Sequence, residues 1–222
     1  MVQVPLPLVN KQPARIPPLE NGDRLSRDEF EKRYAEWPDS RAELIEGIVH
    51  MAAALRFRSH GKPHSQLNGW LWAYQMLMPG TELADAPSVR LDSGNEPQPD
   101  LVLIWAADRG GQTRISIDDY IEGSPEFIAE ISASTVSIDL GSKKTAYERN
   151  GVQEYLVWRV LDQEIDWFWL ENDRYSLLQA DGDGITRSRI FPGLWLDRSA
   201  LLRGEMNRVL EVVRQGVTTI QT

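Results

Sequence analysis

Two acidic residues stand in the sequence where a charged side chain is costly to bury. Asp100 opens the apolar run at 101–105, and Glu130 lies inside the apolar segment FIAEIS. A buried, ionised carboxylate is unfavourable unless it is paired or bound to a metal. Because side chains alternate along a strand, Glu130 shares its face with Ile128 and Ser132. We therefore regard Asp100 and Glu130 as candidate ligands for Mg²⁺ or Mn²⁺, cations that prefer oxygen ligands.

One lysine is predicted to point toward these carboxylates from a neighbouring helix. Leu140, Lys143 and Tyr147 are spaced so that they share one helix face. Leu140 and Tyr147 should face the sheet, and Lys143 should therefore face it too. Lys144 is rotated by about 100° and should reach solvent. Two acids and an inward lysine can bind a divalent cation and help to ionise or orient a water molecule.

Each of these residues also has a purely structural interpretation. Asp100 could satisfy backbone N–H groups at a strand start, and Glu130 could form a buried salt bridge with an arginine. The stem of Lys143 could lie along the sheet with its ammonium group in water. A third acid, Glu43, alternates with apolar neighbours in the segment ELIEG, where Glu46 competes for the same role. The sequence alone does not choose between the structural and the catalytic interpretations.

A basic segment at 55–63 and nearby polar residues are candidates for contacting a substrate. Segments of this kind are usually solvated loops, and we expect this one to be mobile. Its cationic side chains nevertheless offer the best local contacts for phosphate. Hydroxyl groups that follow a strand more often cap the next element, and the three histidines lack the spacing of a zinc site. The substrate-binding candidates are Arg56, Arg58, Lys62, His64 and Ser132.

Hydrophobic periodicity and capping signals predict the helices that position these residues. The segment from Ser26 to Glu29 is a capping box. Asp139 is a candidate N-cap, and Gly151 is suited to end the helix that follows it. Apolar residues recur at helical spacing between 64 and 78, which indicates an amphipathic helix. Helices are predicted at about 26–36, 64–78, 139–150 and 197–215.

Strand signals surround these helices. Two of them, at 99–106 and 125–132, are nearly continuous apolar runs, as expected for strands that are covered on both faces. The succession of strand, helix and strand from 125 to 160 indicates a βαβ-like crossover. Two short apolar runs on either side of Gly47 indicate a hairpin or a bulged strand. Strands are predicted at about 81–91, 99–106, 125–132 and 154–160, followed by an antiparallel meander with turns at 171–173 and 181–184.

Length and composition fit one α/β domain, which we place at 23–222 after a proline-rich arm at 1–22. The absence of cysteine excludes disulfides, thiolate zinc sites and a cysteine nucleophile, and it fits a reducing cytoplasm. The chain has no apolar run long enough for a membrane span, and its first residues do not resemble a secretory signal. The net charge of −9 weighs against nucleic acid as a substrate unless basic residues cluster on one face or a metal supplies positive charge.

Several short segments, taken in order and at compatible spacing, resemble the Uma2 (DUF820) family of restriction-endonuclease-like proteins. The resemblance extends over roughly residues 25 to 202, nearly all of the predicted domain. It implies an α/β fold with a restriction-endonuclease-like core, in which a mixed central sheet is flanked by helices. The segments that carry it are 43–47 (ELIEG), 99–102 (PDLV), 130–135 (EISAST), 143–147 (KKTAY), 151–155 (GVQEY) and 191–197 (FPGLWLD).

The resemblance also implies roles for individual residues. In the wider PD-(D/E)XK nuclease superfamily, the active-site lysine lies two residues after the glutamate, a position that Ser132 occupies here. The family pattern implies that Asp100 and Glu130 bind the metal. Lys143 then takes the lysine role from the helix, and Glu43 supplies an additional upstream acid.

These observations predict a Mg²⁺- or Mn²⁺-dependent endonuclease that hydrolyses phosphodiester bonds in DNA. The aromatic-rich meander and the apolar C-terminal helix suggest that a partner covers some surface. We expect a homodimer, because restriction-type nucleases often pair to cut two strands. Two alternatives stay open. The acidic net charge and the displaced lysine would also suit a catalytically silent binding or assembly module with this fold. A metal-dependent hydrolase of another phosphate substrate would be favoured by a narrow closed pocket.

Overall fold

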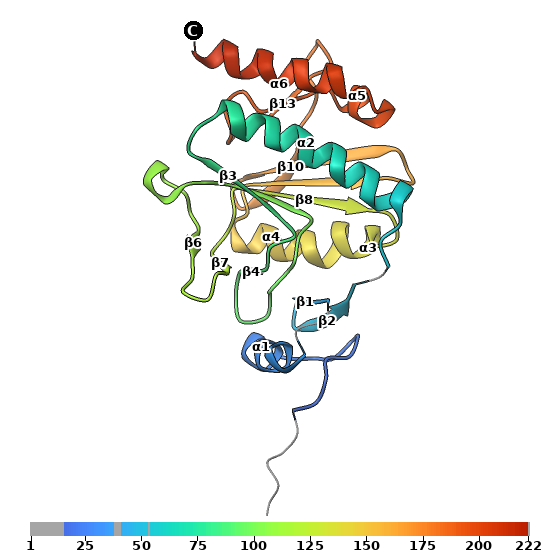
Figure 1. The fold of residues 1–222 in the computed structure, drawn as a ribbon, viewed down its shortest axis with the longest axis vertical. Coiled ribbons are helices and arrows are strands. Elements are labelled where there is room, and N and C mark those ends of the chain that lie inside the picture. Colours follow the sequence, from blue (N-terminus) through green and yellow to red (C-terminus); the bar gives the residue numbers. More distant parts are fainter. Residues whose placement is uncertain (1–15, 38–40, 53, 222) are drawn as a thin grey trace, which may run out of the picture.

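The computed structural model describes residues 16–37, 41–52 and 54–221 (Figure 1). Most of the predicted proline-rich arm, residues 1–15, lies outside the described residues. The described end of the arm packs against the domain, because Leu19 is only 6% exposed and joins an apolar cluster with Phe30 and Val49. The folded unit therefore already includes Leu19.

The N-terminal elements are a helix and a hairpin, namely α1 (Arg27–Glu36), β1 (Ala42–Ile45) and β2 (Ile48–Met51). The predicted N-cap is confirmed, since Ser26 Oγ accepts a hydrogen bond from Glu29 N at 3.4 Å, but the side chain of Glu29 accepts from Arg33 instead of completing the capping box. Of the two forms expected around Gly47, the structure has the hairpin. Its turn residues Glu46 and Gly47 have φ of 52° and 72°, the left-handed region that a tight two-residue hairpin turn requires.

A six-stranded mixed sheet forms the centre of the molecule, with its strands in the order β11-β10-β9-β8-β5-β3. The pair β8 and β9 is parallel, and every other neighbouring pair in this sheet is antiparallel. This arrangement confirms the predicted mixed sheet and its parallel crossover. The six strands are β3 (Thr81–Asp85), β5 (Leu101–Trp105), β8 (Phe127–Ser132), β9 (Glu154–Arg159), β10 (Glu164–Glu171) and β11 (Arg174–Leu177).

Helices cover both faces of this sheet, as the fold class predicts (Figure 1). One face carries α2 (Lys62–Leu77), α5 (Arg198–Arg203) and α6 (Met206–Gln221), and the other carries α3 (Val136–Ile138) and α4 (Lys144–Asn150). On the α2 side, Leu101 packs in the same cluster as Trp70. On the α4 side, Val102 packs in the same cluster as Tyr147.

The alternation of side chains places Glu130 on the α4 side of the sheet. Val102 of β5 and Ile128 of β8 both belong to the apolar cluster on that side. Asp100 lies two residues before Val102, and Glu130 lies two residues after Ile128. The carboxylate of Glu130 points toward the crossover helix that runs from α3 to α4, as the period of two predicts, and Asp100 lies just before β5.

The crossover helix begins three residues earlier than predicted, and a π-helical turn at Asp139–Lys143 joins α3 to α4. Asp139 is therefore not the N-cap. Thr135 holds that position, and its hydroxyl donates to Asp139 Oδ2 at 2.6 Å. Because Asp139 lies inside the helix, its carboxylate is buried next to Lys143. Gly151, with a φ of 83°, ends the helix as predicted.

The basic segment at 55–63 is not the loop that the sequence predicts. Phe57–Gly61 forms a π-helical turn that runs directly into α2. The N–H groups of His60 and Gly61 both donate to Arg56 O, so the helical backbone begins before the predicted start at 64. A proline in the first turn of α2 does not interrupt this path, because N–H groups there have no partner within the helix.

Two predicted strand assignments need correction. The strand at 81–91 breaks at Ala86, whose φ is 50°, and its second half joins a separate small sheet. The last strand of the predicted meander leaves the central sheet, since β12 (Thr186–Arg187) pairs with β13 (Trp195–Leu196) instead of β11. The small sheet is made of β4 (Val89–Arg90), β7 (Ile121–Glu122) and β6 (Arg114–Ile115), and a 3₁₀ turn spans Ala107–Arg109.

The helix predicted at 197–215 is two helices. Gly204 has a φ of 75° and ends α5, and α6 begins shortly after it. The apolar face of α6 is covered within the chain, because Val209 and Val213 pack in the same cluster as residues of α2. This face therefore gives no reason to expect a partner. Of the helices that the structure describes, none has the length and apolar character needed to cross a membrane.

Candidate active site

One ammonium group is surrounded by carboxylates beside the ends of the central strands. Lys143 Nζ lies 3.0 Å from Glu130 Oε1 and 2.9 Å from Glu43 Oε2. A longer contact of 3.9 Å joins it to Asp139 Oδ1. Tyr147, one helical turn further along, donates its hydroxyl to Glu130 Oε1 at 3.1 Å. The predicted inward face of the crossover helix thus meets the strand that carries Glu130.

Asp100 lies next to this group on the neighbouring strand, where the antiparallel register of β5 and β8 places it opposite Glu130. Asp100 Oδ2 accepts a hydrogen bond from Ile131 N at 2.6 Å, and Oδ1 lies 3.0 Å from His60 Nε2. The backbone contact agrees with the structural interpretation of Asp100, whereas the imidazole contact goes beyond it. The acid–lysine cluster, as we use the term below, consists of Glu43, Asp100, Glu130, Asp139 and Lys143.

The acid–lysine cluster holds four carboxylates and one ammonium group in a largely buried setting. The side chains of Lys143 and Glu130 are each 6% exposed. Burial raises the pKa of Glu130 well above its ordinary value; Lys143 opposes this shift and the neighbouring acids add to it. Burial would lower the pKa of Lys143, but the surrounding carboxylates hold it above its ordinary value. The ammonium group therefore stays charged, and the acids outnumber the positive charge available to them.

This donor set fits a hard divalent cation. Mg²⁺ binds oxygen ligands, keeps several water molecules and needs only one or two carboxylates from the protein. Asp100 and Glu130 offer two carboxyl groups next to each other, and a bound cation would favour their ionised forms against the effect of burial. In the described part of the chain, no three His, Cys, Asp or Glu side chains are arranged as a ready-made metal site. A cation here would therefore keep water as most of its ligands.

Three members of the acid–lysine cluster line a groove in the surface, whereas Glu130 and Lys143 lie buried behind them. A hollow of about 770 Å³ is lined by Asp100 together with Phe57 and His64. A second hollow, of about 250 Å³, is lined by Glu43 and Asp139. The two hollows share three lining residues, so they are neighbouring parts of one groove. The shared residues are Arg41, Ala52 and Gln98.

The predicted basic residues lie on the wall of this groove or next to it. Arg56 lines the groove and is exposed. His64 also lines it, with its Nε2 3.4 Å from Asp85 Oδ1. Arg58 and Lys62 are exposed on the same segment but do not line the groove. Of the three cations, Arg56 is therefore the one that a substrate in the groove would contact directly.

Two other residues weighed from the sequence do not line the groove. Ser132 is fully buried, so its hydroxyl is not open to a substrate. Glu46, the competitor of Glu43, pairs with Arg149 through hydrogen bonds of 3.0 and 2.8 Å. Glu43 is thus the acid of the segment ELIEG that reaches the cluster.

Two residues of the site were expected in other roles, His60 as part of the basic segment at 55–63 and Asp139 as an N-cap. His60 and His64 are four residues apart, which puts two side chains on one helix face, and their rings stack with centroids 5.6 Å apart. The hydrogen bond with Asp100 raises the pKa of His60, and burial opposes this shift. Asp139 lies one helical turn before Lys143. Because the crossover helix starts before Asp139, this spacing puts both side chains on the same helix face.

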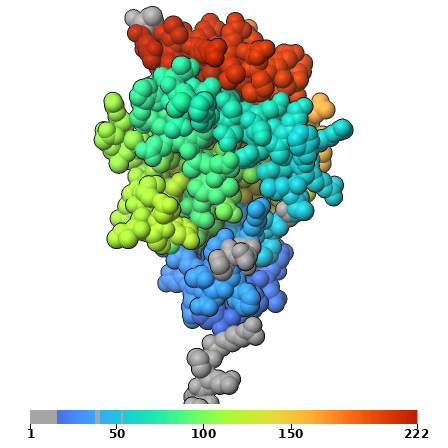
Figure 2. Space-filling model, in the orientation of Figure 1, coloured from blue at the N-terminus to red at the C-terminus, as the bar shows by residue number. Residues whose placement is uncertain are grey.

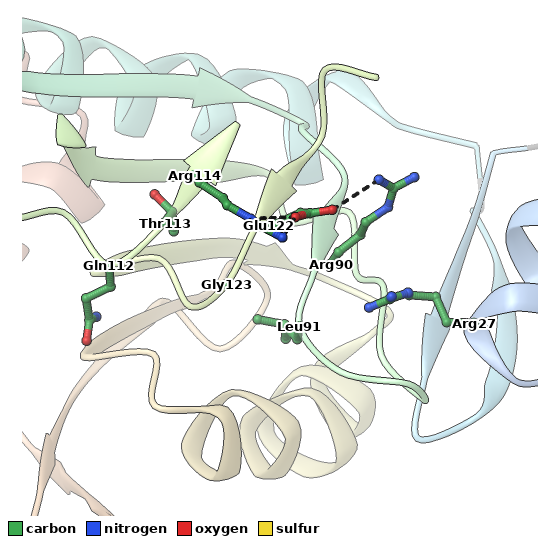
Figure 3. A pocket seen from close by; sticks show the side chains of 8 residues that line it. All are labelled: Arg27, Arg90, Leu91, Gln112, Thr113, Arg114, Glu122 and Gly123. Carbon is green, nitrogen blue, oxygen red and sulfur yellow. Dashed lines mark hydrogen bonds and ion pairs between the residues drawn. The ribbon is translucent and has the colours of Figure 1, made fainter. Parts of the chain in front are cut away.

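A separate hollow of about 440 Å³ lies next to α1 and the small sheet of β4, β7 and β6 (Figure 3). Three arginines line it, but Arg90 and Arg114 both pair with Glu122, as Figure 3 shows. Arg90 also pairs with Glu31 at 2.8 Å and with Asp118 at 2.7 Å. These cations are neutralised within the protein, and no member of the acid–lysine cluster lines this hollow. We therefore place the candidate active site in the groove.

The fold defines the class of protein. The chain is similar to the crystal structure of a "putative nuclease belonging to DUF820" from Anabaena variabilis ATCC 29413, with a TM-score of 0.63 and 13% sequence identity. The match covers 81% of this chain and 98% of that chain. At this identity the likeness shows the fold alone, which is that of a nuclease-like α/β protein.

The family follows from the sequence itself. The model of the Uma2 family, described as "Putative restriction endonuclease", matches residues 27–199. The chain belongs to the Uma2 family, and the resemblance drawn from the short segments is confirmed. No curated protein matches the chain.

Proposed function

We propose that this protein is a metal-dependent nuclease that hydrolyses phosphodiester bonds in DNA, with Mg²⁺ or Mn²⁺ as its cofactor. The observation that carries the proposal is the acid–lysine cluster, in which Lys143 bridges Glu130 and Glu43 next to Asp100. Buried acids in excess of their counter-charges are costly in a purely structural core. A role in holding a cation at the edge of a groove accounts for them. Membership of a family described as "Putative restriction endonuclease" supports the same conclusion.

In this proposal Asp100 and Glu130 hold the cation. A bound Mg²⁺ or Mn²⁺ supplies an activated water and stabilises negative charge on phosphoryl oxygens. Ile131 N fixes the orientation of Asp100 through its hydrogen bond of 2.6 Å, and Tyr147 does the same for Glu130 at 3.1 Å. These contacts hold the two carboxylates in place before a substrate binds.

Lys143 acts in this proposal as a positioned cation. Its ammonium group has three donors and no acceptor. Glu130 and Glu43 lie within 3.0 Å of it, whereas the contact with Asp139 is 3.9 Å long. The third donor therefore has capacity for a water molecule or a phosphate oxygen next to the carboxylates, where it stabilises developing negative charge.

The distribution of charge along the chain allows a polyanion to approach the groove despite the net charge of −9. Residues 47–81 contain none of the 33 acidic residues, and they carry Arg56, Arg58, Lys62 and all three histidines. This stretch forms one wall of the groove and all of α2. Figure 2 shows α2, in cyan and green, as a continuous surface above the blue N-terminal elements. A local basic surface steers a phosphate backbone even when the whole protein is acidic.

DNA cleavage assays with Mg²⁺, Mn²⁺ or EDTA test the proposal on single-stranded and double-stranded substrates. Cleavage is expected with either metal and not with EDTA. Asp100→Ala and Glu130→Gln should lower the rate by about 100-fold or more, because each weakens the electrostatic stabilisation of the transition state. Glu171→Gln, at an exposed acid outside the groove, is the matched control and should keep full activity. Cleavage that persists unchanged in both site variants would sink the proposal.

A catalytically silent binding module with the same fold is the second candidate. It is favoured by the fact that both oxygens of Asp100 are already engaged, by Ile131 N and by His60. Calorimetry separates the two candidates. A nuclease should bind Mg²⁺ in a manner that Glu130→Gln abolishes, whereas a binding module should show no carboxylate-dependent heat.

A homodimer remains part of the proposal, since two copies of the site could then cut two strands. The covered face of α6 gives no support to it, so the oligomeric state needs its own measurement. Light scattering at the concentration of the cleavage assay should give twice the mass of one chain. A monomer that cleaves both strands of a duplex would contradict the dimer and leave the nuclease in place.

A further inference from the structure

The mouth of the groove carries apolar side chains that stay in contact with solvent. Phe57 is 75% exposed and Leu55 is 60% exposed, and both line the larger hollow together with Asp100. Met51, 36% exposed, lines the adjoining hollow. Single exposed apolar residues are normal on a protein surface. Three of them at the mouth of one groove, next to a candidate catalytic acid, form a patch that indicates a ligand.

Cationic residues alternate with the apolar residues of this patch along the chain. Phe57 lies between Arg56 and Arg58 in the sequence, Lys62 follows one turn later, and all three cations are exposed. Residues 47–81, which include this segment, contain no acid. A single strand of nucleic acid has the matching chemistry, because its bases offer flat apolar faces and its phosphates offer negative charge.

The backbone around Phe57 is ordered by hydrogen bonds. Phe57 opens the π-helical turn, and its carbonyl accepts a hydrogen bond from the N–H of Lys62. Arg56 O accepts hydrogen bonds from His60 N at 2.9 Å and Gly61 N at 3.1 Å. An aromatic side chain on an ordered turn loses little conformational freedom when it binds a ligand. Short π-helical turns of this kind occur frequently at functional sites.

We infer that Phe57 stacks on an unpaired base of the substrate strand, while Arg56 and Arg58 contact the phosphates on either side. The inference rests on the proposed nuclease function and names its substrate class, which is DNA with an unpaired nucleotide near the bond that is cut. Phe57 and Asp100 line the same hollow, so the stacked base and the reacting phosphate belong to nearby nucleotides. A base inside a duplex has no free face for the ring, and freeing it costs energy.

Binding of DNA labelled with 2-aminopurine, in the presence of EDTA, tests the inference without hydrolysis of the probe. Single-stranded and fully paired probes are titrated with the full chain, and anisotropy and 2-aminopurine fluorescence are recorded. The unmodified chain should bind the single strand more tightly and quench its fluorescence. Phe57→Ala should weaken this binding by about 5- to 140-fold and abolish the quenching, because one stacked base contributes about 1–3 kcal/mol. Phe57→Trp should preserve both signals.

Ile117→Ala is the matched control, since Ile117 is fully exposed and lies outside the groove. It should bind and quench like the unmodified chain. Three results would overturn the inference: no quenching by the unmodified chain, equal binding and quenching by Phe57→Ala, or a loss of self-association in Phe57→Ala. The last result, measured by light scattering, would show that the patch is an interface between copies of the chain.

The results that would reject the proposed nuclease function differ from those that would reject the stacking contact. Quenching that depends on Phe57, without metal-dependent cleavage, would reject the nuclease and keep the stacking contact. Cleavage that depends on Glu130, with normal activity and binding in Phe57→Ala, would reject the stacking contact alone.

Discussion

At the scale of single residues, the candidate site depends on one buried ammonium group. Lys143 lies within 3.0 Å of two carboxylates, and its side chain is 6% exposed. Removing one partner of a buried ion pair destabilises a protein by roughly 3–5 kcal/mol, because the other charge stays buried without compensation. Lys143→Met should therefore lower the free energy of unfolding by about that amount in metal-free buffer. Urea denaturation at neutral pH measures it.

The next residue in the chain provides the control for this prediction. Lys144 was expected to reach solvent, but its Nζ lies 3.9 Å from the centre of the Phe168 ring and the residue is half-buried. A cation–π contact of this kind contributes about 0.5–1 kcal/mol. Lys144→Met should therefore have a small effect. Equal losses of stability in Lys143→Met and Lys144→Met would contradict a special role for the buried ammonium group.

The sequence could place some site residues but not others, for a physical reason. Strand and helix periods fix the face of a side chain once its element is known, which is why Glu130 and Lys143 were expected on facing surfaces. His60 and Asp139 lie in π-helical turns that extend a helix beyond its predicted start. Their partners could not be predicted, because a loop or a cap was assumed where a helical turn exists.

At the scale of elements, a buried carboxyl group joins the N-terminal helix and hairpin to the rest of the domain. Glu96 is 5% exposed, and its backbone pairs with that of Leu44 in β1. Burial, together with the neighbouring Glu31 of α1, raises the pKa of Glu96 from 4.5 to about 8. The folded state therefore favours the neutral, protonated form of this side chain.

Stability should depend on pH through this group. Because the pKa of Glu96 is higher in the folded than in the unfolded state, its contribution is fully present below about pH 4.5 and is lost as the pH rises toward 8. Glu96→Gln is permanently neutral and does not lose this contribution. The melting temperature of the variant should therefore rise relative to that of the unmodified chain as the pH increases across this range. Thermal melts at a series of pH values measure the difference. Curves that stay parallel would assign the pH dependence to other groups.

Element types were easier to predict than element boundaries. The apolar runs of β5 and β8 and the amphipathic pattern of α2 are long enough to reveal their period. The two-residue strands of the small sheet are too short to show any period. The break at Ala86 needs a positive φ of 50° in a residue that rarely adopts one, so tertiary contacts decide it and local sequence does not.

At the scale of the whole molecule, charge is segregated. The chain carries −9 overall, yet residues 47–81 are free of acids and include the basic wall of the groove. Under the proposed function, nucleic acid is repelled by most of this surface and attracted at the groove. Orientation of the strand along the groove is then an electrostatic effect, and it should respond to salt.

Binding to single-stranded DNA should weaken as the salt concentration rises. The slope of log K against log salt concentration should be proportional to the number of cations at or next to the groove. Arg41, Arg56, Arg58 and Lys62 can each neutralise one phosphate, and a single strand gives about −0.7 per contact, so the logarithmic slope should be about −3. Arg58→Gln should reduce the steepness of this slope by about 0.7. Arg174→Gln, at an exposed residue of the outer strand β11, should leave it unchanged. A slope that Arg58→Gln does not alter would mean that DNA approaches another face, because counterions are released only where phosphates meet cations.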